Sequence, residues 1–367
     1  MTVGFGAATP VFGTDTEVPL HFGNPVAEQE RYESGAGLYY AGPAPLVAVT
    51  GADRFSWLTT LSTQVIAEGD GPNNTEMLLL DHNGHIEFAA AVINTADTTY
   101  LLSETPAELA EYLQSMKFML AVDVQDRTGE YELFSGVNLP SGVLDRFPAG
   151  TLQWVDPWPN VAPGGAQYFQ GRHPGADLPT ELFLVPAAAA DSAFERADLA
   201  PVGSLAAEAT RVSAWRPRFS TEVDAKALPA ELDWLRTAVH TDKGCYRGQE
   251  SVARIINLGK PPRRLVFLQL DGSLGSIPAP GDTVELQGRT VGFVTSVARH
   301  SEMGPIALAL VRRGVDPNAT LNIGPIAAAQ EIIVSPEGKS DHSPQENPAA
   351  RLRAQRGADS RPDLRGA

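Results

Sequence analysis

The residues best suited to chemistry lie together at positions 243–250, which read KGCYRGQE. This octet joins the only cysteine of the chain, Cys245, to two cations, two glycines, a phenol, an amide and a carboxylate. Lys243 can stabilise a thiolate, and a helix that begins near Gly248 would direct its free N–H groups toward the sulfur. The pattern favours a functional thiol over the alternative, a small buried hydrophobic residue.

Each neighbour of the thiol has a ligand-binding and a plainer interpretation. Lys243 can contact an anionic ligand or be a solvated cation, and Tyr246 can stack on a heterocycle or only pack its ring. Gln249 and Glu250 can present their polar edges to a ring system, although Glu250 would also complement a helix dipole. Arg254 can form an ordinary ion pair with Glu250 one helical turn away.

The histidines give weaker signals than the thiol. His240 lies five residues before Cys245 and can act as its base. His82 and His85 flank an Asn-Gly pair, which favours a tight turn over a metal site that would need further ligands. A single cysteine cannot hold an iron–sulfur cluster alone, so a cluster at Cys245 would need ligands from a partner or a second copy.

Composition excludes several classes of protein. The 367 residues exceed one ordinary core, so two or three domains are expected. A net charge of −16 disfavours nucleic-acid binding, and no stretch reaches the ~20 apolar residues of a membrane span. The start of the chain lacks the pattern of a secretory signal, and one cysteine suits a reducing compartment, so we expect a cytoplasmic location.

The first third of the chain predicts an α+β unit with antiparallel strands. Apolar runs at 75–81 and 85–93 flank the Asn-Gly pair and predict a hairpin. The order of elements is β-α-β-β-β-α-β-β, which is typical of an α+β domain. The other predicted strands are 46–49, 98–102, 121–124 and 131–135, and the predicted helices follow residues 53 and 104.

The later part of the chain predicts a different architecture. Residues 216–247 show little periodicity and carry the octet, as a functional loop would. Short apolar runs separated by glycine turns from 263 to 334 predict a small closed or sandwiched β domain. We therefore divide the chain into an N-terminal extension (1–30), an α+β domain (31–136), a second α+β part (137–262), a β-barrel (263–335) and a disordered tail (336–367).

The octet, continued by Ser251-Val252-Ala253-Arg254, resembles the signature of the YgfZ family, which is related to the glycine cleavage T-protein. That signature has seven fixed positions, and only Arg247 occupies its variable one. Residues 47–55 and 115–120, and the glycines of the last domain, are also similar to the superfamily. The resemblance covers roughly residues 20–335.

The resemblance implies three domains in a ring around a channel that holds tetrahydrofolate, with a small C-terminal β-barrel. It implies a folate-binding accessory factor for assembly or repair of iron–sulfur clusters in client enzymes, with iron–sulfur client or scaffold proteins as partners. The reactive groups would be a channel-facing Cys245 and Lys243. The folate contacts would be Tyr246, Gly248, Gln249, Glu250 and Arg254.

Two departures from the T-protein weaken the case for aminomethyl transfer. The strand after its first hairpin carries acidic residues, whereas here Glu87 is followed by Phe88. The T-protein grips the pterin with a glutamate two residues after an arginine, whereas here Arg211 is followed by Ser213, and Glu208 is a possible substitute. The alternatives are a folate-dependent one-carbon transferase or demethylase with Glu87 as acid–base group, and a scaffold that binds no folate.

Overall fold

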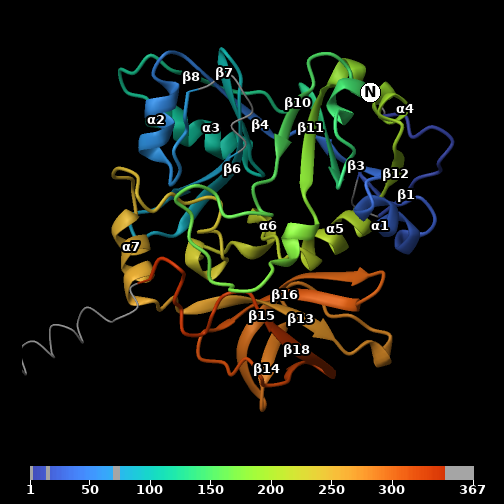
Figure 1. Ribbon diagram of the computed structural model, residues 1–367, viewed down its shortest axis with the longest axis vertical. Coiled ribbons are helices and arrows are strands. Elements are labelled where there is room, and N and C mark those ends of the chain that lie inside the picture. The colour runs from blue at the N-terminus through green and yellow to red at the C-terminus, as the bar shows by residue number, and fades with distance from the viewer. Residues whose placement is uncertain (1–2, 14–16, 69–74, 344–367) are drawn as a thin grey trace, which may run out of the picture.

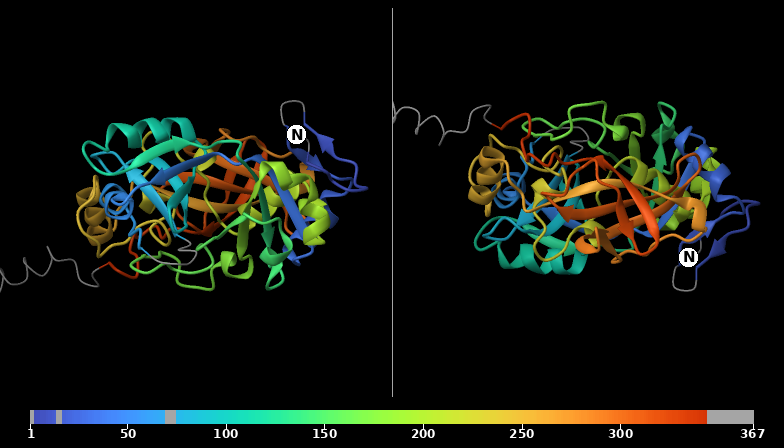
Figure 2. Two further views of the ribbon diagram at one scale, coloured as in Figure 1. Left: turned by 90° about the horizontal axis from the view of Figure 1, so that it is seen from above. Right: turned by 90° about the horizontal axis from the view of Figure 1, so that it is seen from below.

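The computed structural model describes residues 3–13, 17–68 and 75–343. Within them the chain forms three lobes, two built on five-stranded sheets and one on a closed barrel (Figure 1). Viewed from above and below, the barrel lies beneath both sheet lobes (Figure 2). A short ribbon of β1 (Val11–Phe12) and β2 (Pro19–His21) precedes the lobes.

The first sheet is antiparallel and carries two helices on one face. Along β5 the side chains alternate: Met77 and Leu79 pack in the core of this lobe, whereas Leu78 and Leu80 join the central core between the lobes. The strand order is β5 (Thr75–Leu80), β6 (Ile86–Asn94), β7 (Thr98–Leu102), β4 (Leu46–Thr50) and β8 (Asp123–Asp126), with α2 (Arg54–Leu61) and α3 (Pro106–Ser115).

The predicted hairpin is confirmed between β5 and β6. Its turn contains Gly84 at φ +88°, and the Asp81 carboxylate accepts hydrogen bonds from the backbone N–H of Asn83 (2.7 Å) and of His85 (2.8 Å). Such a positive φ favours glycine, because a side chain there would be strained. The sequence signal was sufficient here because the turn depends on adjacent residues alone.

The second sheet draws strands from both sides of the predicted boundary at 136/137. Its strands β3 and β9 come from the part that the sequence assigned to the first domain. The strand order is β10 (Leu152–Val155), β11 (Thr180–Pro186), β9 (Tyr131–Val137), β3 (Gly37–Pro43) and β12 (Ala200–Val202), and the helices of this lobe are α1 (Pro25–Glu33), α4 (Ala193–Ala197) and α5 (Ser204–Ser213).

The third lobe is a closed six-stranded barrel, so the closed form of the predicted β domain is confirmed. Val266 and Leu268 fill its interior, whereas Leu265 and Phe267 point outward into the central core shared with the other lobes. Around the barrel the order is β13 (Arg263–Leu270), β16 (Gly304–Arg312), β15 (Arg289–His300), β14 (Thr283–Leu286), β17 (Leu321–Ile323) and β18 (Ile326–Ile332).

Two short helices and a C-terminal segment complete the described chain. The helices are α6 (Phe219–Glu222) and α7 (Gln249–Leu258). Residues 336–343, which we expected to be disordered, contact the body: the Ser343 hydroxyl donates to the Ile256 carbonyl (2.7 Å), and the Gln167 N–H donates to the Asp341 carboxylate (2.9 Å). The rest of the predicted tail lies outside the described residues. No helix in the described ranges is long and apolar enough to cross a membrane.

Candidate functional site

A cavity of about 600 Å³ lies where the two sheets meet α5. This volume suits a small organic ligand. Both sheets supply apolar walls, and the loop from 214 to 219 supplies charged groups. The apolar wall includes Ala89, Ala90, Ala91, Leu102, Leu133, Trp154 and Leu182.

The innermost part of the cavity holds two carboxylates bridged by one guanidinium. Arg216 donates to both oxygens of Glu76 (3.2 and 2.8 Å) and, through Nε, to Asp156 (2.9 Å). Glu76 also accepts hydrogen bonds from the Trp234 indole (3.0 Å) and the Thr237 hydroxyl. Its acceptor sites are therefore occupied by protein donors.

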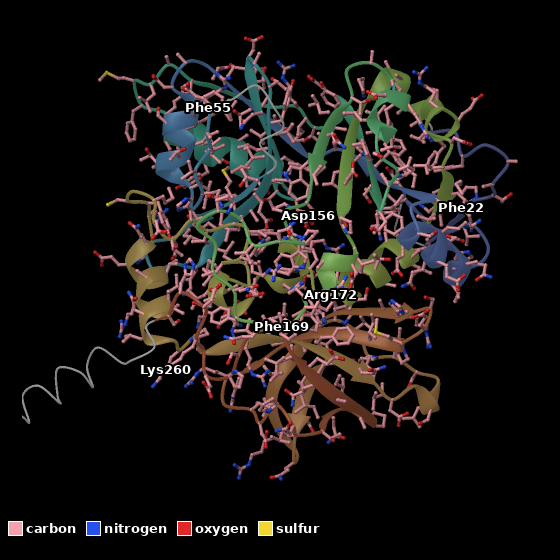
Figure 3. The ribbon with its side chains drawn as sticks, in the orientation of Figure 1. Phe22, Phe55, Asp156, Phe169, Arg172 and Lys260 are labelled. Atoms are coloured by element: carbon pink, nitrogen blue, oxygen red, sulfur yellow. The ribbon has the colours of Figure 1, made fainter. Side chains whose placement is uncertain are left out.

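Asp156 keeps acceptor capacity for a ligand. Its Oδ1 accepts one hydrogen bond from the Trp158 N–H (3.0 Å) and its Oδ2 one from Arg216, so each oxygen retains a lone pair. Burial raises the pKa of Asp156, and Arg216 opposes that shift more than the Glu76 charge adds to it. Asp156 lies at the centre of the molecule, between the sheets and the barrel (Figure 3).

A second charged cluster holds α5 against the barrel. Arg211 donates to both oxygens of Glu208 (3.0 and 2.6 Å), to Glu222 (3.1 Å) and to the Ser296 hydroxyl of β15 (2.6 Å). Burial alone would raise the pKa of Glu208, but Arg211 lowers it below its usual value. Glu208 therefore presents a fixed negative charge to the cavity that it lines. Ser213 is not a lining residue, because its hydroxyl donates to the Thr210 carbonyl (2.9 Å).

The octet lies outside this cavity, since none of the lining residues falls between 235 and 262. Cys245 is exposed at the surface, so the expectation that it faces the channel is not met. The physical reason is that the octet packs against the outer end of the β5–β6 hairpin. A Cβ at Gly248 would lie 2.6 Å from the Asp81 carbonyl oxygen.

Lys243 joins the octet to the end of α2 in the folded chain. Its ammonium donates to the carbonyls of Thr59 (2.5 Å) and Ser62 (2.6 Å), at the C-terminal end of α2. A cation is favourable there because helix carbonyls carry partial negative charge. The ammonium also lies 4.7 Å from the centre of the Tyr246 ring. Burial lowers the pKa of Lys243 to about 8, against the opposing effect of Cys245.

The other octet residues shape the start of α7. Gly248 has φ +82° and precedes the first helical residue, Gln249, so the predicted helix start is confirmed. The Gln249 amide donates to the Lys243 carbonyl (3.3 Å), and Tyr246 is buried, which raises its pKa. Glu250 and Arg254 are exposed along α7. Whether these residues bind folate stays a prediction.

Glu87 is also placed outside the cavity. It is half-exposed and accepts a hydrogen bond from Arg247 of the octet (3.1 Å), while Phe88 packs against Tyr112. The expectation that Glu87 is an acid–base group of the folate channel is therefore wrong. A β-bulge leaves Glu87 without a partner on β5, because Leu80 pairs with Ile86 and Leu79 with Phe88.

The histidines form no metal centre in the part of the chain that the structure describes, where no group of three metal-ligating residues occurs. His85 Nδ1 lies 3.0 Å from Asp81 Oδ2 and closes the hairpin turn. His240 Nδ1 accepts a hydrogen bond from the Asp242 N–H (3.2 Å). The ring of His240 is therefore engaged by the loop itself.

Sequence reasoning missed the polar centre of the cavity. Glu76, Asp156 and Arg216 are each separated by at least 60 residues, so no local motif joins them. One signal was available: Glu76 is a lone carboxylate within the apolar run TEMLLL. A charge at such a position needs a buried partner.

Two known transferases are similar to this chain in sequence. No model of a known protein family matches the chain. A chloroplastic candidate transferase of Arabidopsis thaliana is 35% identical over 97 residues, which are 26% of this chain and 21% of that protein. The aminomethyltransferase of Shouchella clausii is 26% identical over 316 residues, which cover 82% of this chain and 84% of the relative.

A solved structure extends the likeness to the fold. The glycine cleavage system aminomethyltransferase T of Bartonella henselae superposes with a TM-score of 0.69 and 17% identity, covering 90% of this chain and 94% of the other. The narrower resemblance to the YgfZ family stays a prediction. The chain is homologous to aminomethyltransferases and has the fold of aminomethyltransferase T.

Proposed function

We propose that the chain binds tetrahydrofolate, or a one-carbon derivative of it, in the cavity between its two sheets. The observation that carries this proposal is the free acceptor capacity of Asp156 inside a cavity of about 600 Å³ with apolar walls. The homology to an aminomethyltransferase supports the same ligand.

The residues present fit this ligand. A pterin ring is planar and offers adjacent N–H donors, which a carboxylate with one free lone pair on each oxygen can accept. The partly buried lining residues Leu102, Leu133 and Leu182 provide apolar surface for a flat ring. The polar groups are few and converge at one end, as is typical of a small-molecule site.

We propose further that the chain serves as an accessory factor for iron–sulfur clusters in client proteins, acting through Cys245. An exposed thiol suits a macromolecular partner better than a ligand enclosed in the cavity. The cluster would be cargo, with its other ligands supplied by the client or scaffold.

Calorimetry with tetrahydrofolate tests the first proposal, with an Asp156→Asn variant and a Cys245→Ala variant. We expect Asp156→Asn to weaken binding by about tenfold and Cys245→Ala to leave it within twofold, because the thiol lies outside the cavity. Absence of binding by the unaltered chain would refute the proposal. Client cluster enzymes should lose activity with Cys245→Ala, and full client activity would refute the accessory role.

A second candidate function is folate-dependent one-carbon transfer. It is favoured by the burial of Asp156 beside a second carboxylate, which raises the pKa of Asp156 and suits it to exchange a proton with a bound ligand. Single-turnover assays with methylated or aminomethylated donors distinguish the two functions. At saturating tetrahydrofolate, formation of methylene-tetrahydrofolate from an aminomethylated donor, or of methyl-tetrahydrofolate from a methylated one, would favour the transferase if Asp156→Asn abolishes it.

A further inference from the structure

Three arginines line the cavity, and two of them are committed to protein carboxylates. Arg216 is held by Glu76 and Asp156, and Arg211 by two carboxylates, a hydroxyl and the Arg216 carbonyl (2.6 Å). Their side chains are 15% and 13% exposed. Both guanidiniums therefore serve to hold protein carboxylates in place.

Arg218 differs from the other two. Its side chain is 42% exposed, and its guanidinium makes one side-chain hydrogen bond, from Nη1 to Glu208 Oε2 at 3.3 Å. Its Nε is buried and has no hydrogen-bond partner. The backbone is nevertheless fixed, because the Arg218 N–H donates to Glu222 (2.8 Å). The side chain is thus anchored at its base and largely uncommitted at its tip.

The surroundings of Arg218 place it at the mouth of the cavity. Leu205, which is 45% exposed, and the exposed Glu104 line the same region. Asp156 belongs to the buried end of the cavity, where it is 8% exposed. Both oxygens of Glu208 already accept hydrogen bonds from Arg211, so Glu208 neutralises the charge of Arg218 only in part. Glu104 is engaged by the Ser220 N–H (3.1 Å).

We infer that Arg218 is a specificity-determining residue that binds the anionic end of the cavity's ligand, in particular a carboxylate. A guanidinium with free N–H groups is the donor best matched to a carboxylate. Resting on the proposed function, this inference assigns the flat ring to the end near Asp156 and the glutamate tail of tetrahydrofolate to Arg218. The ligand would then span the cavity from its buried end to its mouth.

A thermodynamic cycle tests the inference by pairing a protein change with a ligand change. The affinities of tetrahydrofolate and of its glutamate diester, which lacks the negative charges, are measured by calorimetry for the unaltered chain and for Arg218→Gln. Arg127→Gln, which alters a surface arginine paired with Glu130, serves as control. Arg218→Lys separates the charge from the planar donor geometry.

We expect Arg218→Gln to weaken tetrahydrofolate binding by about tenfold and to leave binding of the diester within twofold. Arg218→Lys should recover part of the loss, and added salt should reduce the difference because Arg218 is partly exposed. Equal losses for both ligands, or no loss for either, would overturn the inference. Failure of tetrahydrofolate to bind the unaltered chain would instead refute the proposed function.

Discussion

Replacing Arg216 by methionine should expose the energetic cost of the two carboxylates inside the cavity. Three hydrogen bonds join the Arg216 guanidinium to Glu76 and Asp156, whose side chains are 6% and 9% exposed. The substitution also removes the cation from above the Trp158 ring, 5.0 Å away. Because two buried charges would lose their common partner, we expect the free energy of unfolding to fall by about 3–5 kcal/mol at pH 7.

The loss in Arg216→Met should depend on pH with a definite sign. Burial raises the pKa of Asp156, and without the guanidinium nothing opposes that shift. The folded variant then binds more protons than the unfolded chain, so its stability falls as the pH rises through the pKa of this group. We therefore expect the difference from the unaltered chain to be larger at pH 8 than at pH 5.

Urea denaturation followed by tryptophan fluorescence at pH 5, 6.5 and 8 measures this effect. Arg127→Met, which removes one exposed partner of a surface pair, is the matched control and should change stability by less than about 1 kcal/mol. Adding Glu76→Gln and Asp156→Asn to Arg216→Met should restore much of the loss, since no buried charge remains. A loss below about 1 kcal/mol, or one independent of pH, would show that the carboxylates do not rely on Arg216.

Three further predictions concern groups outside the cavity. Burial raises the pKa of Asp233 to about 8, against the opposing charge of Arg236. Because the folded chain then holds a proton that the unfolded chain releases, the free energy of unfolding should fall by about 1.4 kcal/mol per pH unit between about pH 5 and 7.5. Asp233→Asn should remove this dependence of the free energy of unfolding on pH, as measured by urea denaturation. The same dependence in the variant and the unaltered chain would contradict the prediction. Gly248→Ala should cost about 1–3 kcal/mol, because φ is +82° and the new Cβ would approach the hairpin; an unchanged melting temperature would argue against it. Lys243→Met should cost about 1–3 kcal/mol in thermal unfolding, because two carbonyls lose their donor, whereas a lysine serving only the thiol would leave stability unchanged.

Features that depend on neighbouring residues could be predicted from the sequence. The hairpin follows from its Asn-Gly pair, the start of α7 from Gly248, and the barrel from short apolar runs separated by glycine turns. The second sheet could not be divided correctly in this way. Its strands β3 and β9 pair across about ninety residues, for example Tyr39 with Ser135, and local periodicity carries no record of such pairing.

The cavity was beyond sequence reasoning for a related physical reason. A density of reactive groups predicts chemistry at the octet, but it does not say whether the octet faces inward. The decisive contact is that of Gly248 with the outer turn of the hairpin, which fixes Cys245 at the surface. Arg216 looks ordinary in the sequence, and even Glu76, a lone carboxylate in an apolar run, becomes part of a site only through contacts 140 residues apart.

The β5–β6 hairpin nevertheless joins the two sites physically. Glu76, on β5, binds Arg216 inside the cavity, whereas Asp81 and Gly84, at the turn of the same hairpin, contact the start of α7. Its two strands pair directly, and its turn is closed by the Asp81 carboxylate, so the hairpin is one continuous element between the two sites. A ligand held near Arg216 and a partner bound at Cys245 would therefore act on opposite ends of one element without sharing a side chain. Asp156→Asn should therefore weaken folate binding without loss of the thiol, and Cys245→Ala should abolish client support without loss of folate binding. Each substitution removes contacts at one site only.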